Sequence, residues 1–388
     1  MKILIDALNA KPIAGGTFQI CLNFIKRTTE AHNDNIEWIY FVTQDIDKFL
    51  HNTFEKQLNS SYFVFPRSTN ILSFIKVQKR VKVLEDSIKP DLVYSITAPT
   101  RYSFKSTLVL RHTNPWVTHP NKYAKQKVDW KTLLRLRVIC FFKKQMLKRG
   151  NYFVTQSQSA KNGIKKITKV ENNKIAVIPN VLPACFSDLK YEKRIDDNIV
   201  NIACIAVPHP HKNLDIIPDV LLCLKDKYNI DNIVFHLTLP KNSSQWIAIR
   251  EKTQQYGLGK KVINHGYRTQ MQLVDIYSIC NLAFTPSLLE TFSAAPLEAM
   301  FFQCYVVASD LDFNRDVTGD AALYFKPMDA EDAASKIHQI LTDDITQTQL
   351  KQNMRQCIKL FDSYEHHYNQ TIDFFSRIIN EVKFKNIK

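Results

Sequence analysis

The stretch Asn281–Asp310 reads NLAFTPSLLETFSAAPLEAMFFQCYVVASD, and its pattern of apolar runs indicates the fold class. The apolar run Leu282–Thr285 predicts a buried strand, and Tyr305–Ala308 predicts a second one. Between them a helix is expected to begin near Pro296, because proline is tolerated in a first helical turn but not in a helix interior. A strand, a helix and a strand in this order are typical of an α/β fold with a parallel sheet.

Two acids flank the start of this helix: Glu290 lies in the loop and Glu298 in the helix. The backbone N–H groups of Thr291, Phe292 and Ser293 lie at the helix N-terminus, where unbonded N–H groups form a ready-made site for a diphosphate. Carboxylates are poor phosphate ligands, but they accept hydrogen bonds from sugar hydroxyls. We therefore expect a diphosphate between two hydroxyl-binding acids. Spacing alone leaves open that Glu290 and Glu298 are ordinary surface acids near an α/β turn.

Short apolar runs alternate with longer amphipathic segments along the rest of the chain. Strands are expected at Lys2–Leu8, Trp38–Thr43, Tyr62–Phe65, Leu92–Ile96, Thr107–Leu110, Tyr152–Thr155 and Ile175–Ile178, and then at Ile199–Val207, Ile233–Leu239, Lys261–Ile263, Leu282–Thr285 and Tyr305–Ala308. Helices are expected at Leu72–Ser87, Lys125–Lys148, Asp215–Lys227 and Gln272–Ser278. This alternation predicts an α/β fold of two Rossmann-like, doubly wound domains that face a deep interdomain cleft, where ligands bind at the carboxyl ends of the strands.

The strand pattern pauses at Asn180–Asn198, which holds Pro183 and the charged stretch Lys190–Asp197. A polar stretch with a proline is typical of a domain boundary. We place one domain at residues 1–183, a second at 195–362, and a C-terminal helix at 363–388, in which Ser363–Lys383 is amphipathic.

The formal net charge of +15 is carried by the first half of the chain; residues 101–150 contain a single acid, Asp129, among 13 lysines and arginines. A strongly positive surface attracts nucleic acid, anionic lipid headgroups or a phosphate-linked substrate. No zinc-finger spacing or aromatic RNA-recognition signature accompanies it, so we expect no nucleic-acid partner. The alternative is a solvated basic face without a dedicated partner.

The eight cysteines are scattered without a C-x-x-C pair, which indicates reduced thiols in a cytosol and neither a disulfide framework nor a structural zinc site. No apolar run is long enough to span a membrane, and Met1–Leu8 lacks the long apolar core and cleavage site of a signal peptide. We expect a cytoplasmic protein that can attach peripherally to the inner face of the cell membrane.

The segment Glu290-Thr291-Phe292-Ser293-x-x-x-Leu297-Glu298-Ala299-Met300 resembles the E-x7-E signature of glycosyltransferase family 4, whose members are retaining enzymes of GT-B fold. The resemblance continues in register through Thr285–Ser287 before the signature and through Tyr305–Asp310 and Gly319–Phe325 after it. It implies a GT-B fold with an acceptor-binding N-terminal domain, a C-terminal domain that binds a nucleotide-sugar, and a last helix that crosses back to the N-terminal domain.

The activity implied by the resemblance is transfer of a hexose from a nucleoside diphosphate sugar, with retained configuration, to a glycan or a polyprenyl-diphosphate-linked acceptor. The expected setting is bacterial cell-surface polysaccharide biosynthesis, such as lipopolysaccharide or capsule. Two alternatives stay open: a sugar-nucleotide epimerase of the same fold, and a catalytically inactive sugar-nucleotide-binding protein.

The resemblance also implies roles for residues of the second domain. Lys212, followed by Asn213, would bind the diphosphate of the sugar donor together with the amides of Thr291, Phe292 and Ser293. Glu290 would hold hydroxyls of the donor sugar, and Glu298 those of the ribose. The family usually has an arginine a few residues before the lysine, but this loop reads Ala206–His211. We expect either that His209 or His211 partly substitutes for the arginine or that the diphosphate charge is neutralised more weakly.

In the first domain, Gly15 and Gly16 are similar to the family's glycine loop, which approaches acceptor and donor phosphate. His112 closes a strand where the family often has a histidine at the cleft, and would contact the donor sugar and the developing positive charge. Both assignments have an alternative without a ligand. The glycines can form a plain strand-to-helix turn, and His112 can serve the packing of the fold alone. No cofactor and no metal are expected, because Lys212 and the helix N-terminus supply positive potential; the D-x-D strings Asp45–Asp47 and Asp310–Asp312 arise often by chance.

Basic and apolar residues interleave in two helix-like segments of the first domain. Lys76, Lys79, Arg80 and Lys82 accompany Ile71, Leu72, Phe74 and Ile75, and Arg135, Arg137, Lys143, Lys144, Lys148 and Arg149 accompany Leu134, Phe141 and Phe142. This combination suits attachment to an anionic membrane surface. The alternative is an apolar stripe that faces the core beneath a solvated basic face.

Overall fold

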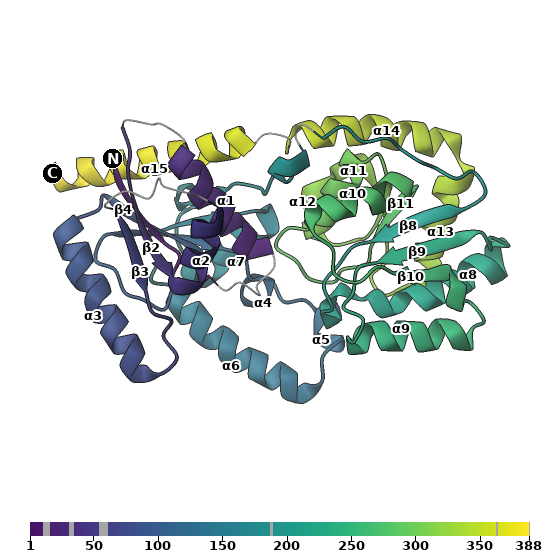
Figure 1. The fold of residues 1–388 in the computed structure, drawn as a ribbon, viewed down its shortest axis with the longest axis horizontal. Helices are drawn as coiled ribbons and strands as arrows, with labels where there is room; N and C mark the ends of the chain where they lie inside the picture. The colour runs from purple at the N-terminus through teal and green to yellow at the C-terminus, as the bar shows by residue number, and fades with distance from the viewer. Residues whose placement is uncertain (11–15, 31–34, 54–60, 187–188, 362–363, 388) are drawn as a thin grey trace.

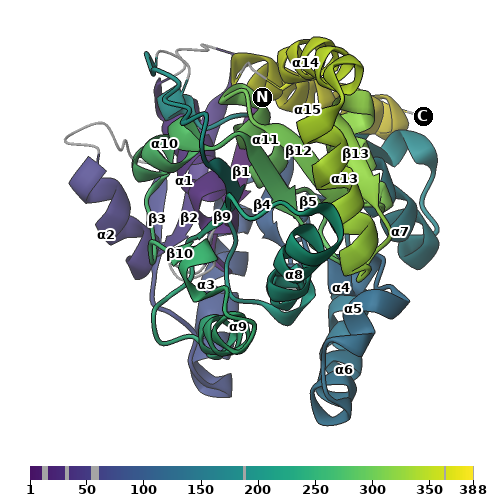
Figure 2. The same cartoon turned by 90° about the vertical axis from the view of Figure 1, so that its right-hand side faces the viewer.

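The computed structural model describes residues 1–10, 16–30, 35–53, 61–186, 189–361 and 364–387, which form two lobes side by side (Figure 1). Each lobe contains one β-sheet in which every strand pair is parallel, with helices on both faces (Figure 2). The two sheets confirm the predicted α/β fold of two Rossmann-like domains.

The sheet of the first lobe has seven strands in the spatial order β3-β2-β1-β4-β5-β6-β7. They are β1 (Lys2–Asp6), β2 (Glu37–Thr43), β3 (Tyr62–Phe65), β4 (Leu92–Ala98), β5 (Thr107–His112), β6 (Tyr152–Thr155) and β7 (Ile175–Val177). The central strands are apolar and almost wholly buried, because a parallel sheet is covered on both faces.

Helices of the first lobe divide between the two faces of this sheet. They are α1 (Gly16–Glu30), α2 (Gln44–Thr53), α3 (Ile71–Ile88), α4 (Pro115–Thr118), α5 (Lys122–Gln126), α6 (Trp130–Leu147) and α7 (Gln158–Thr168). Phe24 of α1 and Ile46 of α2 pack on one face. Val77 of α3, Leu147 of α6 and Ile164 of α7 pack on the other.

The sheet of the second lobe has six strands in the order β10-β9-β8-β11-β12-β13. The strands are β8 (Val200–Cys204), β9 (Ile233–Leu237), β10 (Val262–Asn264), β11 (Leu282–Thr285), β12 (Tyr305–Ser309) and β13 (Ala322–Phe325). The helices are α8 (Ile217–Tyr228), α9 (Ser244–Gln255), α10 (Gln270–Ile279), α11 (Ala294–Phe301), α12 (Asp312–Thr318), α13 (Ala330–Thr342) and α14 (Asp344–Lys359). Because β8 and β11 are neighbours at the centre, the loops that follow them lie together at one edge of the sheet.

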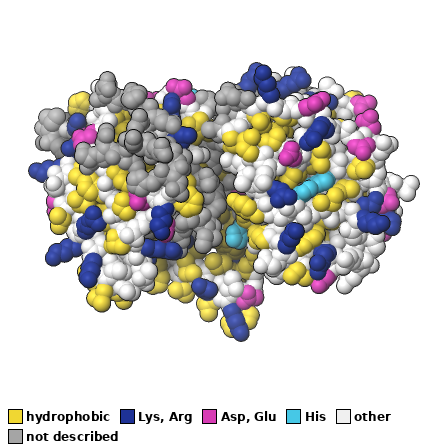
Figure 3. Space-filling view, viewed as in Figure 1, with side chains coloured by type: hydrophobic (Ala, Val, Ile, Leu, Met, Phe, Trp, Pro, Cys, Tyr) yellow, Lys and Arg dark blue, Asp and Glu magenta, His cyan; other side chains and the backbone are white. Residues whose placement is uncertain are grey.

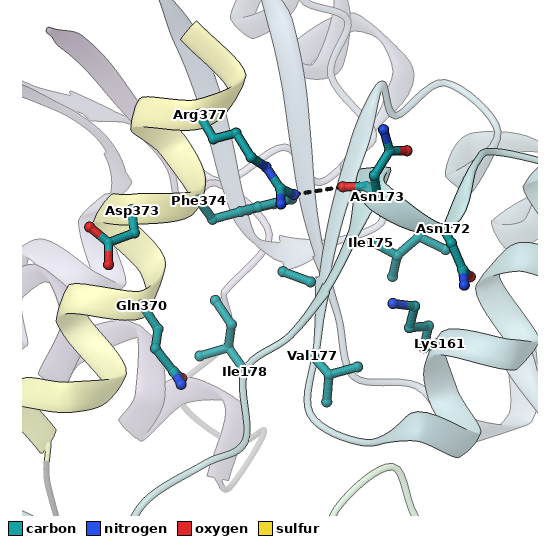
Figure 4. Close-up of a pocket in the computed structure, with 11 residues that line it drawn as sticks. Lys161, Asn172, Asn173, Ile175, Val177, Ile178, Gln370, Asp373, Phe374 and Arg377 are labelled. Carbon is teal, nitrogen blue, oxygen red and sulfur yellow. Dashed lines mark hydrogen bonds between the residues drawn. The ribbon is translucent and has the colours of Figure 1, made fainter. Parts of the chain in front are cut away.

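The last helix, α15 (Tyr364–Ile387), leaves the second lobe and packs against the first. Phe375 and Ile378 are fully buried in the first-lobe core. Figure 4 shows Arg377 of α15 donating a hydrogen bond to the carbonyl of Asn173 (2.6 Å) beside a groove of about 510 Å³ along the edge strand β7. The predicted amphipathic helix begins at Ser363, which lies outside the described residues, and the described part, α15, has its apolar face on the first lobe.

Several element boundaries differ from those expected. The predicted helix Lys125–Lys148 is interrupted, because the Asp129 carboxylate accepts from the Thr132 N–H (3.0 Å) and starts α6 as a separate helix. Strand β13 was not expected as a strand. Helix α11 begins at Ala294, so Pro296 lies in its first turn, as its tolerated position requires.

Lys193 lies in the linker between the lobes, and its side chain forms hydrogen bonds to the second lobe. Its ammonium donates to the carbonyls of Tyr277 (3.0 Å), Cys280 (2.6 Å) and Phe302 (2.7 Å). These carbonyls lie at the C-terminal ends of α10 and α11, where unbonded carbonyls and the helix dipole favour a cation.

Replacing Lys193 by methionine should lower the free energy of unfolding by about 2 kcal/mol, because three carbonyls lose their donor. Urea unfolding followed by circular dichroism measures this change. The same replacement at exposed Lys190 serves as the control and should change stability little. Equal stability of the two variants would show that the Lys193 contacts are not stabilising.

Candidate active site

Lys212 and Glu290 form an ion pair at the carboxyl edge of the second sheet. Lys212 ends a short 3-10 helix, Pro210–Lys212, in the loop after β8, and Glu290 lies in the loop after β11. The ammonium bonds to the carboxylate, and each side chain is 15% exposed. The two loops are also joined by the Leu288 N–H, which donates to the His211 carbonyl (2.7 Å). The predicted diphosphate-binding lysine and sugar-binding acid thus lie together.

Asn213, next to Lys212, is held in a left-handed backbone conformation (φ 54°) that asparagine tolerates. Its side chain is fully buried, and neither of its amide atoms has a hydrogen-bond partner among the described residues. An unpaired buried amide is costly, so Asn213 has hydrogen-bonding capacity that the described protein groups leave unused.

The backbone at the start of α11 provides the other half of the predicted phosphate site. Ser293 is the N-cap residue, and its side chain makes no capping hydrogen bond. Within the part of the chain that the structure describes, no backbone hydrogen bond uses the N–H groups of Thr291, Phe292 or Ser293. The side chain of Phe292 itself is buried against Phe361, so only its backbone is placed to bind a ligand.

Glu298 is buried in α11 and faces a cavity between the lobes. Its carboxylate accepts from the Tyr277 hydroxyl (3.2 Å), and burial raises its pKa to about 7. The cavity, of about 610 Å³, is lined on the second lobe by Glu298 and Tyr267–Met271, and on the other side by α1, the linker at Asn180–Pro183 and the start of α15. A carboxylate with a partly open cavity beside it can accept hydrogen bonds from a ligand.

His112 is fully buried at the end of β5. Its Nε2 lies 2.9 Å from the Asn114 carbonyl, which can only accept, so Nε2 carries the proton. Its Nδ1 has no partner among the described residues. Burial lowers the pKa of His112 to about 4, so the ring is neutral near pH 7. The structure thus gives His112 an unused acceptor nitrogen, and no exposed surface toward the cleft.

The segment of the first lobe between β5 and α5 makes hydrogen bonds to the loop that contains Glu290. The sequence patterns do not predict these contacts. His119 Nε2 donates to the Glu290 carbonyl (2.6 Å), and Asn121 Nδ2 donates to the Leu288 carbonyl (2.6 Å). The Thr291 hydroxyl donates to the Thr113 carbonyl (3.2 Å). These contacts fix the loop from the opposite lobe. The only feature of the sequence that indicates these contacts is the cluster of polar residues that follows β5.

The loop that lacks the expected arginine contains two stacked histidines. The rings of His209 and His211 lie 5.3 Å apart at 12°, and burial lowers the pKa of both, to about 4 for His211. Both rings are therefore neutral near pH 7. They can supply hydrogen bonds to a diphosphate but not the permanent charge of an arginine.

Arg111 and Ser159 have contacts that the sequence did not indicate. The buried Arg111 guanidinium donates to Asn180 Oδ1 (2.8 Å) in the linker, and its Nη1 has no partner among the described residues. Ser159 contacts Asp316 of the other lobe through its N–H (3.0 Å) and hydroxyl (2.8 Å), while Ser157 caps α7. Ser159 therefore connects the two lobes, and Arg111 connects the first lobe to the linker.

The predicted glycine loop is only partly visible. Gly15 lies outside the described residues, and Gly16 is the first residue of α1. Within the described ranges, no three His, Cys, Asp or Glu side chains gather as they would around a metal ion. In the D-x-D string Asp310–Asp312, the carboxylate of Asp310 is paired with Arg315 (2.6 Å). Independence from metal stays a prediction.

The raised pKa of Glu298 predicts a pH-dependent stability. Between its ordinary pKa of 4.5 and about 7, the folded protein binds a proton that the unfolded chain releases, so stability falls as pH rises through this window. Glu298→Gln should remove this loss and become more stable than the wild type by about 3 kcal/mol at pH 8, and by little at pH 4. Urea unfolding at both pH values measures the difference.

The exposed Glu251 provides the control for this experiment. Glu251→Gln should differ from the wild type by the same small amount at both pH values. A Glu298→Gln difference that does not grow with pH would contradict the buried environment of Glu298.

Comparisons with known proteins find similarity to one family and to several individual proteins. Residues 191–357 match the profile of the family described as "Glycosyl transferases group 1". The chain is 25% identical over 284 residues to the serotype-specific mannosyltransferase WbdA of Escherichia coli, covering 68% of this chain and 34% of WbdA. It is 25% identical over 234 residues to the O-antigen chain mannosyltransferase RfbU of Salmonella typhimurium, covering 60% of each. The chain thus spans about a third of WbdA.

A solved structure agrees with the fold over the whole length. Anabaena Alr3699/HepE, in complex with UDP and glucose, superimposes with a TM-score of 0.68 over 97% of this chain and 100% of that chain, at 17% identity. Among the described residues, no helix is long and apolar enough to cross a membrane. The chain has the GT-B fold, and its residues 191–357 are similar to the glycosyl transferases group 1 family.

Proposed function

We propose that the chain is a retaining glycosyltransferase that moves a hexose from a nucleoside diphosphate sugar to a glycan or a polyprenyl-diphosphate-linked acceptor. The observation that carries the proposal is the Lys212–Glu290 pair beside the unbonded N–H groups at the start of α11. The named activities of WbdA and RfbU, and the UDP and glucose in the HepE complex, support this class of reaction and of sugar donor. The setting is bacterial cell-surface polysaccharide assembly on the cytoplasmic side of the membrane.

The Lys212–Glu290 pair is suited to exchange partners when a sugar donor enters. The ammonium of Lys212 would turn to the diphosphate, and the freed Glu290 carboxylate would accept hydrogen bonds from the sugar hydroxyls. The N–H groups of Thr291, Phe292 and Ser293 would bind the remaining phosphate oxygens. Positive groups fixed before the reaction stabilise the charge that develops on the leaving diphosphate, which is usually the largest catalytic contribution.

The remaining site residues fit the nucleoside and the reacting sugar. Glu298 lines the cavity together with Ala294, the first residue of α11, and would bind the ribose hydroxyls. The neutral ring of His112 would accept a hydrogen bond from a sugar hydroxyl at Nδ1, once the donor reaches it. Glu290 is assigned as a hydroxyl acceptor and not as a covalent nucleophile. We propose that a leaving phosphate oxygen takes the proton of the acceptor hydroxyl on the retained face.

One observation favours a second candidate, a sugar-nucleotide-binding protein without turnover. The loop before Lys212 has neutral histidines where family 4 enzymes carry a permanently charged arginine. A thermal-shift screen of UDP, GDP, dTDP and ADP sugars finds the donor in either case, because a ligand that binds only the folded state raises Tm. Sugar transfer to an acceptor panel supports the transferase. Donor binding without transfer supports the binding protein, and a free epimer formed from the donor alone supports an epimerase.

Substitutions at the ion pair separate binding from chemistry. Lys212→Met should lower kcat/KM by about 10²–10³-fold, because a preorganised positive group is lost from the leaving diphosphate. Glu290→Gln should lower transfer as well, but it frees Lys212, so affinity for a nucleoside diphosphate without sugar should be unchanged or tighter. Steady-state kinetics and isothermal titration calorimetry measure the two effects.

The exposed pair Lys227–Glu331 supplies the matched control. Lys227→Met and Glu331→Gln should leave both transfer and nucleotide affinity at wild-type values. Unchanged nucleoside diphosphate affinity in Lys212→Met would remove Lys212 from the phosphate site.

We also propose that transfer needs no metal ion, since Lys212 and the N–H groups of α11 already supply positive potential at the phosphates. Activity in excess EDTA should equal activity in added Mg²⁺ or Mn²⁺. Loss of transfer in EDTA, with recovery on adding metal, would contradict this assignment.

A further inference from the structure

Helix α6 presents a stripe of large apolar side chains to solvent. Trp130, Leu134, Val138 and Phe141 recur every three or four residues, so they share one side of the helix. Together with Phe142 they are 52–71% exposed. Only Leu147, at the end of α6, is fully buried in the core of the first lobe. The alternative of an apolar stripe that faces the core therefore does not describe Leu134, Phe141 and Phe142 of α6.

Helix α3 presents a similar stripe. Ile71, Leu72, Ile75 and Val83 are 55–78% exposed, while Val77 and Val81 on the opposite side are buried in the core. Ile71 and Ile75 are four residues apart, and Val83 follows two turns later, so these side chains lie on the outward side of the helix. Phe74, by contrast, stacks on Tyr102 and belongs to the core side.

The two stripes belong to one surface. Both helices pack on the same face of the first sheet, and both are bonded to Ser103 in the loop between β4 and β5. Gln78 of α3 donates to the Ser103 carbonyl (3.0 Å), and Arg149, just after α6, donates to the Ser103 hydroxyl (2.7 Å). Figure 1 shows α3 and α6 along the lower edge of the first lobe, and Figure 2 shows both projecting from the same side.

Basic side chains border the exposed apolar residues. Those classed as exposed are Lys76, Lys79, Arg80 and Lys82 on α3, and Lys131, Arg135, Arg137, Lys148 and Arg149 on or just after α6. The exposed acids there are Asp86, paired with Lys105, and Asp129, which caps α6. In Figure 3, apolar and basic side chains alternate along this edge. The surface is therefore both apolar and positively charged.

We propose that the outward faces of α3 and α6 together form a surface that binds an anionic lipid bilayer. Apolar side chains on one helix stripe insert among the acyl chains near the headgroups, and the bordering lysines and arginines bind anionic headgroups. Trp130 would lie at the headgroup level, where tryptophan is favoured. The surface goes beyond the proposed function, because it can bind lipid whether or not the chain transfers sugar.

The positive charge of the surface favours binding to a membrane over binding to a protein. The exposed apolar residues named above are spread along two helices and would need a partner of similar length, and lysines are depleted from protein–protein interfaces. An anionic bilayer satisfies both the apolar and the basic side chains at once. Its binding also orients the molecule, because α6 begins close to the lobe contact between Lys127 and Asp215 (2.6 Å), which brings the cleft near the lipid surface.

The test is sedimentation with vesicles, without any nucleotide or sugar. The wild type should sediment with vesicles of mixed phosphatidylglycerol and phosphatidylcholine, and should stay in solution with pure phosphatidylcholine. Binding should weaken as salt rises, because headgroup attraction is screened. On binding, tryptophan emission should shift to shorter wavelength, and Trp130→Phe should abolish that shift. Phe141→Ser with Phe142→Ser should weaken binding by about tenfold or more.

Ile345 and Leu360, which are 82% and 73% exposed on the second lobe, provide the matched control. Their double serine variant should bind vesicles like the wild type, and all variants should keep the wild-type Tm and nucleotide affinity. The proposal is overturned if the wild type stays in solution with anionic vesicles, or if the Phe141/Phe142 variant sediments like the wild type. It is also overturned if the wild type is a dimer that this variant dissociates, without vesicle binding.

Discussion

The Lys212–Glu290 ion pair is the interaction on which the proposed chemistry depends. It joins the loops after β8 and β11, whose strands are neighbours in the second sheet. Two oppositely charged groups with only 15% of each side chain exposed attract strongly, yet each has a separate role once a phosphate and a sugar are present. The pair brings a positive and a negative charge together, and the first lobe holds the Glu290 loop through His119.

Local sequence was sufficient to predict the central elements of this site. Proline at position 296 and the apolar runs on each side set the strand–loop–helix order, and hence the places of Glu290 and Glu298. Contacts between distant segments could not be predicted from local patterns. The bond from His119 to the Glu290 carbonyl spans 171 residues, and the bond from Arg111 to Asn180 spans 69. The same limit applies to the burial of His112, which depends on packing around the end of β5.

The composition predicted that the first half of the chain is basic, but it could not predict whether the apolar side chains there face the core or the solvent. An amphipathic helix sequence can place an apolar stripe on the core or leave it outside. On α3 and α6 the core needs only one side of each helix, so Trp130, Phe141 and Ile71 stay outside beside lysines and arginines. The first lobe, which is assigned to the acceptor, has a positive apolar surface, and the second lobe has the proposed phosphate site. One molecule with both would bring a water-soluble sugar donor to an acceptor held in a membrane.

A crystal structure of the chain with a bound nucleoside diphosphate would show whether Lys212 and the start of α11 bind the phosphates. We predict that the diphosphate lies between the Lys212 ammonium and the N–H groups of Thr291 to Ser293, with the ribose hydroxyls on Glu298 and the Glu290 carboxylate released from Lys212. A nucleotide bound elsewhere, or bound with the Lys212–Glu290 pair intact and Glu298 out of contact, would rule out this phosphate site.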